Sequence, residues 1–244
     1  MAENGQEQTF AADSDAHVCN EGLPFLSYFR ESPLERTMAL NDLHIGAVFQ
    51  PQWDSRPLRV IAFDEGTVMY DCWWPHIPGW GIDSLNRTLA YYRIPTSLLL
   101  SQGKYLRTEE YTEAELAVLR PDLPFSFARF ANLEWPMVCP ATPEEFPNGS
   151  FSCTEDQSNH PCLDAAKIYL EPFGPKGSSK PGVMIEAENR AAFTVKEILW
   201  HAARLQSSFL RDTRVTTGVG IYRSGIRRNL PSYYVWGSKS RMGT

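Results

Sequence analysis

The sequence lacks the features that would direct the chain into a membrane or along a secretory route. Nowhere do about 18 apolar residues follow one another, so we expect no membrane-spanning helix. The first residues, MAENGQEQTFAADSDAH, have neither the basic stretch nor the apolar core of a secretory signal. We therefore expect a cytoplasmic protein. Residues 1–20 are acidic and rich in small side chains, which predicts a mobile tail.

Cysteine is scarce, and the few cysteines are scattered. An odd set of five does not fit a disulfide framework, so reduced thiols are the simpler interpretation. A zinc site normally needs two close ligand pairs such as C-x2-C, and the chain has no C-x2-C. We therefore predict no metal site and no cofactor. The cysteines are Cys19, Cys72, Cys139, Cys153 and Cys162.

Familiar catalytic motifs are also missing. There is no G-x-S-x-G elbow, and the loop GPKGSSKPG (174–182) has its glycines and lysines in the wrong order for a phosphate-binding loop. Cys72 and His76 are the one local nucleophile–base pair, but Pro75 and a turn separate them. Glu186 and Glu188 alternate on one predicted strand face without a matching acidic or basic partner. The sequence thus names no catalytic residue.

What the sequence does contain is enough apolar material for a folded core. Hydrophobic residues make up 43 % of the 244 positions and charged residues 21 %, which excludes a wholly disordered chain. The 18 prolines and 16 glycines favour many turns and short elements over a long helical bundle.

Charge is distributed unevenly. Residues 195–244 carry nine lysines and arginines against Glu197 and Asp212, a net charge of +7. Since the whole chain has a net charge of −6, residues 1–194 carry −13. The protein is therefore mostly acidic with a basic C-terminal fifth.

The N-terminal half predicts a small β-sheet. Residues 45–50, 58–63, 67–74 and 85–94 each have the composition of a strand, and Asp64-Glu65-Gly66 predicts a hairpin turn between the second and third. Four short strands within about 50 residues suggest a curled sheet, for which an SH3-like barrel is one arrangement.

Three capping boxes predict helices. The first begins a short helix at Ser32. The second pairs Thr112 with Glu115 at the start of a helix over residues 112–119, and the third pairs Thr194 with Glu197. The third introduces residues 195–212, whose apolar side chains recur on one helical face.

The C-terminal part combines strands with that helix. Residues 166–173 and 182–189 predict a hairpin before the helix, and VGIYRSGIRR and SYYVWG predict two short strands after it. The fold class is thus α+β, with a small, mostly antiparallel β part followed by a β-hairpin-and-helix part. The predicted divisions are a tail at 1–20, a mostly β region at 21–133, a proline-rich connection at 134–162, and an α+β region at 163–244.

The segment YDCWWPHIPGWG, residues 70–81, concentrates tryptophan. On a strand, Trp73 and Trp74 must face opposite ways, so one enters the core and the other is free to form a groove with nearby aromatic residues. Compensation for the small core of a β domain is the simpler explanation of these aromatic residues, and a contact surface is the other. The candidate partner-binding residues are Trp73, Trp74, Trp80, Tyr91 and Tyr92.

The basic C-terminal segment interleaves arginine with aromatic residues. This combination suits contact with phosphates and stacking on bases, and equally docking on an acidic protein surface. The candidate contacts with a partner or a nucleic acid are Arg223, Arg227, Arg228, Tyr233, Tyr234 and Trp236.

The favoured function is that of a non-catalytic, cytoplasmic interaction protein of bacterial or phage origin, acting as an accessory, immunity or inhibitor protein through a protein–protein surface. The alternative is a nucleic-acid-associated protein that uses the basic segment, with nuclease-like chemistry as a variant, and a phosphate-dependent enzyme comes third. The absence of a local motif argues only weakly against an enzyme, because catalytic residues often meet only in the fold. The sequence indicates no oligomeric state.

Overall fold

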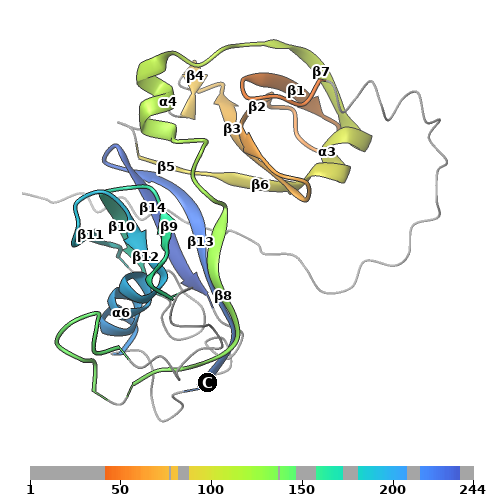
Figure 1. Cartoon of the computed structure of the whole chain (residues 1–244). Helices are drawn as coiled ribbons and strands as arrows, with labels where there is room; N and C mark the ends of the chain where they lie inside the picture. Colours follow the sequence, from red (N-terminus) through yellow and green to blue (C-terminus); the bar gives the residue numbers. More distant parts are fainter. Residues whose placement is uncertain are drawn as a thin grey trace, which may run out of the picture.

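The computed structural model describes residues 42–76, 78–81, 88–136, 138–146, 158–172, 181–207 and 215–236. These residues form mostly antiparallel sheets with three α-helices, which confirms an α+β chain in which β structure dominates (Figure 1). None of their helices has the length and apolar character needed to cross a membrane. The predicted tail at 1–20 and the predicted helix beginning at Ser32 lie outside the described residues.

The first sheet is antiparallel throughout and has the strand order β4-β3-β2-β1-β7, with β6 beside β3. Its first three strands confirm the predicted strands to within two residues, and β2 and β3 form the predicted hairpin. The strands are β1 (Ala47–Pro51), β2 (Leu58–Phe63), β3 (Thr67–Trp74), β4 (Gly79–Trp80), β6 (Tyr92–Pro95) and β7 (Gly103–Thr108).

Two short helices accompany this sheet. The helix α3 (Thr96–Gln102), which the sequence did not predict, connects β6 directly to β7. The helix α4 (Glu113–Leu119) begins with the predicted capping box, in which the Thr112 side chain accepts from the Glu115 amide and the Glu115 carboxylate accepts from the Thr112 amide. It ends at Arg120, which adopts a left-handed conformation with φ of 46°, immediately before Pro121.

The second sheet takes strands from both halves of the chain. Its order is β11-β10-β14-β13-β5, with β8 also paired to β13, and every pair is antiparallel except β10 with β14. The strand β8, which the sequence did not predict, brings residues from the middle of the chain beside the C-terminal hairpin. The strands are β5 (Leu89–Ala90), β8 (Ser126–Glu134), β10 (Lys167–Glu171), β11 (Val183–Glu186), β13 (Val215–Arg227) and β14 (Leu230–Trp236).

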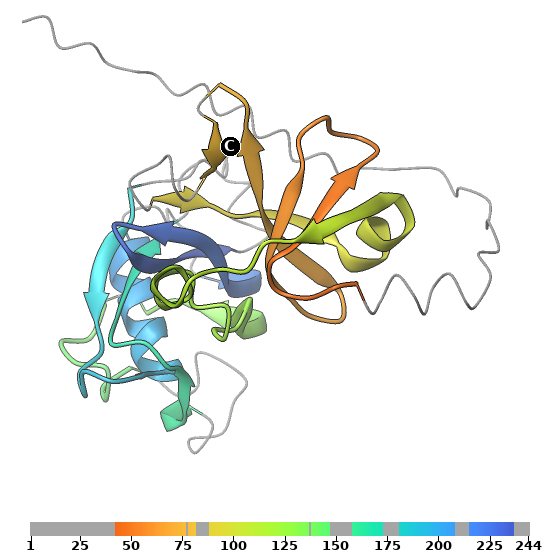
Figure 2. The same cartoon turned by 90° about the horizontal axis from the view of Figure 1, so that it is seen from above.

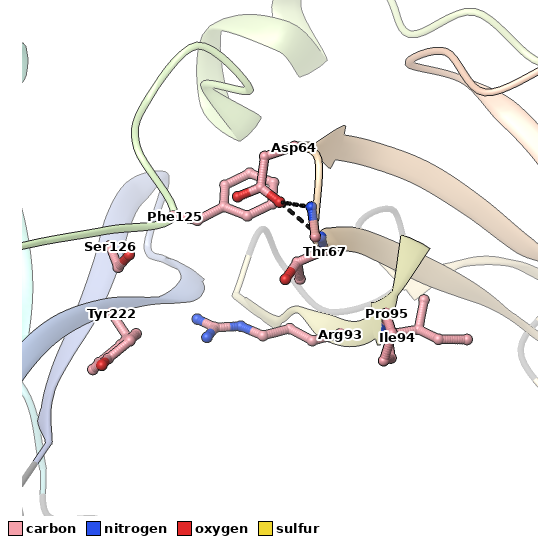
Figure 3. Close-up of a pocket in the computed structure, with 9 residues that line it drawn as sticks. Asp64, Thr67, Arg93, Ile94, Pro95, Phe125, Ser126 and Tyr222 are labelled. Atoms are coloured by element: carbon pink, nitrogen blue, oxygen red, sulfur yellow. Dashed lines mark hydrogen bonds between the residues drawn. The ribbon is translucent and has the colours of Figure 1, made fainter. Parts of the chain in front are cut away.

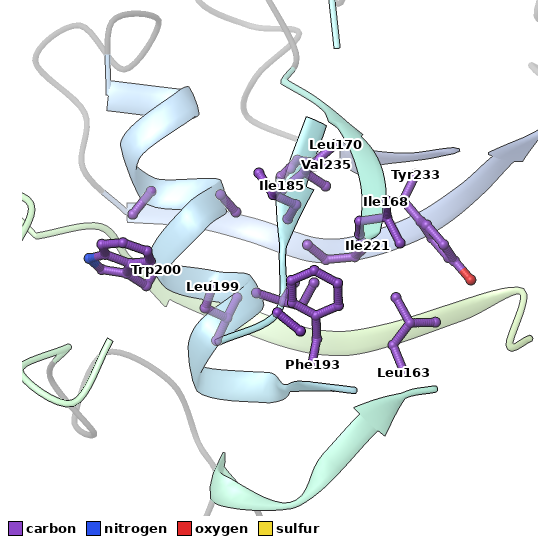
Figure 4. Packing of buried hydrophobic residues seen from close by; sticks show 14 of the residues in the cluster. Leu163, Ile168, Leu170, Ile185, Phe193, Leu199, Trp200, Ile221, Tyr233 and Val235 are labelled. Carbon is purple, nitrogen blue, oxygen red and sulfur yellow. The ribbon is translucent and has the colours of Figure 1, made fainter. Parts of the chain in front are cut away.

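The helix α6 (Val195–Gln206) packs on one face of this second sheet (Figure 4). Its predicted capping box is present, and the side chains of Ile198 and Leu199 are fully buried against Ile168 and Ile221 of the sheet. A two-stranded ladder of β9 (Pro161–Leu163) and β12 (Phe193–Thr194) lies at the start of the helix. The last part of the predicted helix, from residue 208, lies outside the described residues.

The described parts of the proline-rich stretch 134–162 also contribute to this core. Trp135 and Phe146 are each only 1 % exposed and belong to the same apolar cluster as α6. Prolines prevent regular structure here, but the large apolar side chains between them still pack against the helix.

The two sheets lie side by side in both views (Figures 1 and 2). Between them a cluster of buried residues joins Val48 and Ile61 of the first sheet, Val118 and Leu119 of α4, and Ile226 of β13. The first sheet has a second apolar cluster on its other side, around Phe49, Val60 and Leu99. Both of its faces are therefore covered for much of their area.

Candidate functional site

A small open cavity lies where the two sheets meet (Figure 3). Its volume is about 260 Å³. Its walls come from the β2–β3 turn, from β6, and from the beginning of β8 and the middle of β13. The lining residues are Asp64, Gly66, Thr67, Arg93, Ile94, Pro95, Phe125, Ser126 and Tyr222.

Arg93 extends from β6 across this cavity toward the second sheet (Figure 3). Its guanidinium carbon lies 5.6 Å from the centre of the Tyr234 ring, within the range of a cation–π contact. The residue is exposed, and no carboxylate of the described residues lies within ion-pair distance of it. Arg93 therefore presents a positive charge that an aromatic ring holds in place.

Three aromatic side chains, which we call the aromatic strip, continue from Arg93 along β13 and β14. They are Tyr222, Tyr234 and Trp236. The first two are register partners and their rings stack at 5.7 Å with an interplanar angle of 27°, while Trp236 meets Tyr234 edge-on at 6.3 Å. All three are partly exposed, and they lie on the sheet face opposite α6, because their strand neighbours Ile221, Tyr233 and Val235 face the helix.

Asp64, the one acidic residue in the cavity wall, has its carboxylate committed to the β2–β3 turn. Its Oδ1 accepts hydrogen bonds from the backbone amides of Gly66 at 2.9 Å and Thr67 at 2.7 Å. These two hydrogen bonds hold the Asp64 side chain against the turn.

The tryptophan segment divides between two faces, as the strand alternation requires. Trp73 packs against the cluster between the sheets and meets Trp80 edge-on, with ring centres 5.5 Å apart. Trp80 is only 4 % exposed, and its indole donates to Glu109 at 2.6 Å. Tyr91 is 7 % exposed and its hydroxyl donates to the carbonyl of Leu119. Trp80 and Tyr91 therefore offer almost no surface to a partner.

The buried side of this segment surrounds Arg59, which is 4 % exposed. Its guanidinium lies 4.6 Å from the ring of Trp80 and 4.0 Å from that of Tyr111. The carboxylates of Asp71 and Glu115 lie 4.0 Å and 3.9 Å away. This arrangement compensates a buried charge within the core.

Trp74 and Tyr92 lie on the opposite side of the first sheet from Trp73. The ring of Tyr92, which is 38 % exposed, stacks on Tyr70 at 5.6 Å. Trp74 is half-buried beneath the guanidinium of Arg56, which in turn binds Asp54 at 2.7 Å. The five predicted aromatic residues thus do not form one surface.

Two members of the predicted C-terminal set are core residues. Arg223 and Tyr233 are both fully buried, at 0 % exposure. The Arg223 guanidinium donates to the carbonyl of Leu119 and to that of Leu123 at 3.4 Å, and the Tyr233 hydroxyl donates to the carbonyl of Pro124 at 3.2 Å. Both side chains therefore anchor the segment that follows α4.

The remaining arginines of the set lie near the β13–β14 turn. Arg227 is partly exposed, with its guanidinium 5.3 Å from the Tyr169 ring. Burial raises the pKa of the Glu171 carboxyl, and the Ser232 hydroxyl and the charge of Arg227 oppose this shift. Arg228 is exposed and occupies the turn with Asn229, at φ of 49° and 68°. Two successive positive φ values are those of a type I′ hairpin turn.

Sequence analysis missed Arg93, Phe125 and Ser126. Arg93 lies between Tyr92 and Ile94 in a predicted strand. Alternation along the strand indicates only that its side chain points to the opposite face from those of Tyr92 and Ile94. Nothing in the local sequence indicates that β6 runs beside Tyr234. Tyr222 lies in the predicted strand VGIYRSGIRR, but the sequence alone does not indicate its partner Tyr234 on the next strand.

The described cysteines and acidic residues form no recognisable catalytic group. Burial raises the pKa of the Cys72 and Cys162 thiols to about 12, so neither is a thiolate near neutral pH. Among the described residues, no group of three or more His, Cys, Asp or Glu side chains is arranged to hold a metal ion. Cys19 and Cys153 lie outside that part of the chain.

Acidic residues gather at the start of α6, where Glu197 accepts hydrogen bonds from backbone amides at the end of the preceding loop. The Glu197 carboxylate accepts from the Glu188 and Thr194 amides, and Lys196 donates to the Glu144 carbonyl at 2.7 Å. Glu186 instead pairs with Lys167 at 3.2 Å, so it does not act together with Glu188.

Comparison of the chain with protein-family models, with curated proteins and with solved structures found no match.

Proposed function

We propose that the chain is a non-catalytic interaction protein that binds a protein partner through Arg93 and the aromatic strip. The observation that carries this proposal is the stacking of Arg93 on Tyr234 and of Tyr234 on Tyr222 beside an open cavity. Arginine, tyrosine and tryptophan are the residues that contribute most to protein–protein binding when they are held rigid at a surface. Here mutual ring contacts already hold them, which lowers the entropy that binding would cost.

The size of the cavity supports a protein partner over a small-molecule substrate. Its volume of about 260 Å³ is below the roughly 300–1,000 Å³ of pockets that enclose drug-sized ligands. It can receive one side chain of a partner while the aromatic strip contacts the neighbouring ones.

A nucleic-acid-associated function is the second candidate, and the same strip supports it. Partly exposed aromatic rings next to arginine suit the stacking of bases on a single strand. The burial of Arg223 weighs against it, because that guanidinium is committed to backbone carbonyls and adds nothing to a phosphate-binding surface.

A cytoplasmic location and an accessory, immunity or inhibitor role in a bacterium or phage remain parts of this proposal. Free thiols at Cys72, Cys139 and Cys162 support a reducing compartment. An SH3-like closure of the first sheet is also a proposal, supported by α3 joining the two outer strands β6 and β7.

The test is co-purification from the organism that encodes the chain, with three full-length baits. The wild type and Trp53→Ala should retain the same protein in stoichiometric amount, whereas Tyr234→Ala should lose it. Trp53 is a matched control because it is an aromatic residue, 43 % exposed, in the β1–β2 loop away from the strip. Thermal unfolding of each bait confirms that it is folded.

Retention of the same proteins by all three baits would exclude the aromatic strip as the interaction surface. Binding of a labelled oligonucleotide that weakens steeply with salt and is lost in Tyr234→Ala would replace the protein partner by a nucleic acid.

A further inference from the structure

We propose that the cavity beside Arg93 binds a carboxylate side chain, an aspartate or glutamate in an acidic segment of a protein partner. This inference rests on the proposed function and specifies the chemistry by which the partner is recognised. It is carried by the charge of Arg93, by the orientation that its ring contact imposes, and by the composition of the cavity wall.

Arg93 lacks the carboxylate partner that several other arginines of the described residues have. Arg56 binds Asp54 at 2.7 Å, Arg120 binds Asp122 at 2.8 Å, and Arg107 binds Glu109. Arg93 instead contacts the ring of Tyr234 and has no carboxylate of the described residues within ion-pair distance. Its charge is therefore available to an acidic group from another molecule.

The contact with Tyr234 places the guanidinium carbon of Arg93 5.6 Å from the ring centre and involves no ion pair. A guanidinium over an aromatic ring presents one planar face to the ring, while its N–H groups point outward in the plane. Those N–H groups match the two oxygens of a carboxylate in a bidentate, charge-assisted pair. Tyr222 in turn stacks on Tyr234 with ring centres 5.7 Å apart, so the ring beside the guanidinium is itself held in place.

The wall of the cavity suits the rest of such a side chain. Pro95 and Phe125 supply apolar surface for the methylene groups of a glutamate, and Thr67 and Ser126 are the hydroxyl-bearing residues of the wall. Asp64 also lines the cavity, with its Oδ1 bound to the Gly66 and Thr67 amides of the β2–β3 turn. Figure 3 shows Arg93 extending across the cavity toward Tyr222, with Asp64, Thr67 and Phe125 on one side of it.

The experiment uses the full chain and a library of short peptides with blocked termini. Each peptide carries a central glutamate or aspartate between random residues, and a matched library carries glutamine or asparagine at the centre. Peptides that bind the wild type are selected and their affinities are measured by fluorescence anisotropy. The same peptides are then titrated with Arg93→Gln, Arg93→Lys and Arg190→Gln.

We expect selection from the acidic library only. Arg93→Gln should weaken binding by roughly ten- to a hundredfold, the value of a charge-assisted hydrogen-bonded pair, and should abolish the preference for glutamate over glutamine. Arg93→Lys keeps the positive charge but cannot bind both carboxylate oxygens through two N–H groups of one planar guanidinium. It should therefore lose part of the affinity and keep the preference for glutamate over glutamine. Arg190→Gln removes an exposed arginine outside the cavity and should bind like the wild type.

Three results would overturn the inference, and they differ in what they mean for the proposed function. Peptides that bind equally from both libraries, with affinity lost in Tyr234→Ala but not in Arg93→Gln, would leave the interaction surface in place and remove the carboxylate site. An absence of peptide binding, together with the same co-purifying proteins for wild type and Tyr234→Ala, would remove both. A phosphoserine peptide bound in preference to its glutamate counterpart would also overturn the assignment to a carboxylate.

Discussion

The guanidinium of Arg223, in the middle of β13, donates a hydrogen bond to the carbonyl of Leu119, the last residue of α4. A second bond reaches the Leu123 carbonyl at 3.4 Å. The carbonyls at the end of a helix carry partial negative charge and lack hydrogen-bond donors within the helix. A buried guanidinium supplies both a positive charge and a donor to such a carbonyl. This contact fastens a helix from the first half of the chain to a strand from the second.

Replacement of Arg223 should therefore destabilise the fold. We expect Arg223→Met to lower the free energy of unfolding by about 3 kcal/mol, because two buried carbonyls lose a charged donor. Arg228→Met, in the exposed turn of the same hairpin, should change it by less than about 0.5 kcal/mol. Urea titrations monitored by tryptophan fluorescence measure both values, and similar effects for the two variants would show that Arg223 is not the anchor described here.

The three tryptophans of residues 70–81 should differ in their contributions to stability. Trp80→Ala removes a buried indole and should cost roughly 3–5 kcal/mol. Trp73→Ala, which removes its edge-on partner, should cost more than Trp74→Ala, because Trp73 packs in the cluster between the sheets and Trp74 lies on the opposite face. Equal and mild shifts of the unfolding midpoint for Trp73→Ala and Trp74→Ala would contradict this order.

Gly225 should be intolerant of any side chain. It has a φ of 149°, and a Cβ atom there would collide with the Leu89 carbonyl of β5, to which β13 is paired. We expect Gly225→Ala to lower the free energy of unfolding by about 2 kcal/mol or more. Gly66→Ala serves as the control, since the nearest atom to its Cβ would be the Asp64 Oδ1 at 3.8 Å. Thermal unfolding of both variants tests the contrast, which a well-tolerated alanine at position 225 would disprove.

Acid should destabilise the protein partly through His201. Burial lowers the pKa of this imidazole from 6.5 to about 4, with Arg204 adding to the effect, and its Nε2 has no hydrogen-bond partner among the described residues. The unfolded chain binds the proton more readily, so the contribution of His201 is present above pH 6.5 and is lost as the pH falls toward 4.

We expect His201→Phe, which retains ring packing against Trp200, to reduce this acid dependence. Urea unfolding of the wild type and the variant at neutral pH and at pH values inside that window is the measurement. Parallel stability curves for the two proteins would show that His201 does not contribute.

The sequence by itself determined features that depend on neighbouring residues. The capping boxes at Thr112 and Thr194 formed as predicted, because each requires only side chains three positions apart. The β2–β3 hairpin and the opposite orientation of Trp73 and Trp74 followed from turn chemistry and from the alternation of side chains along a strand.

Tertiary structure decided which of these elements meet. Residues 126–134 become a strand because they pair with β13, and the sequence alone does not name that partner. The burial of Arg223 depends on backbone carbonyls about a hundred residues away in the chain. The local sequence of the basic segment does not distinguish this buried arginine from its exposed neighbours. Arg93 acquires its role because β6 lies beside the second sheet, within reach of Tyr234. Local propensity reports the conformation of a segment, whereas a binding surface depends on which distant segments pack together, and the energy of the whole core sets that choice.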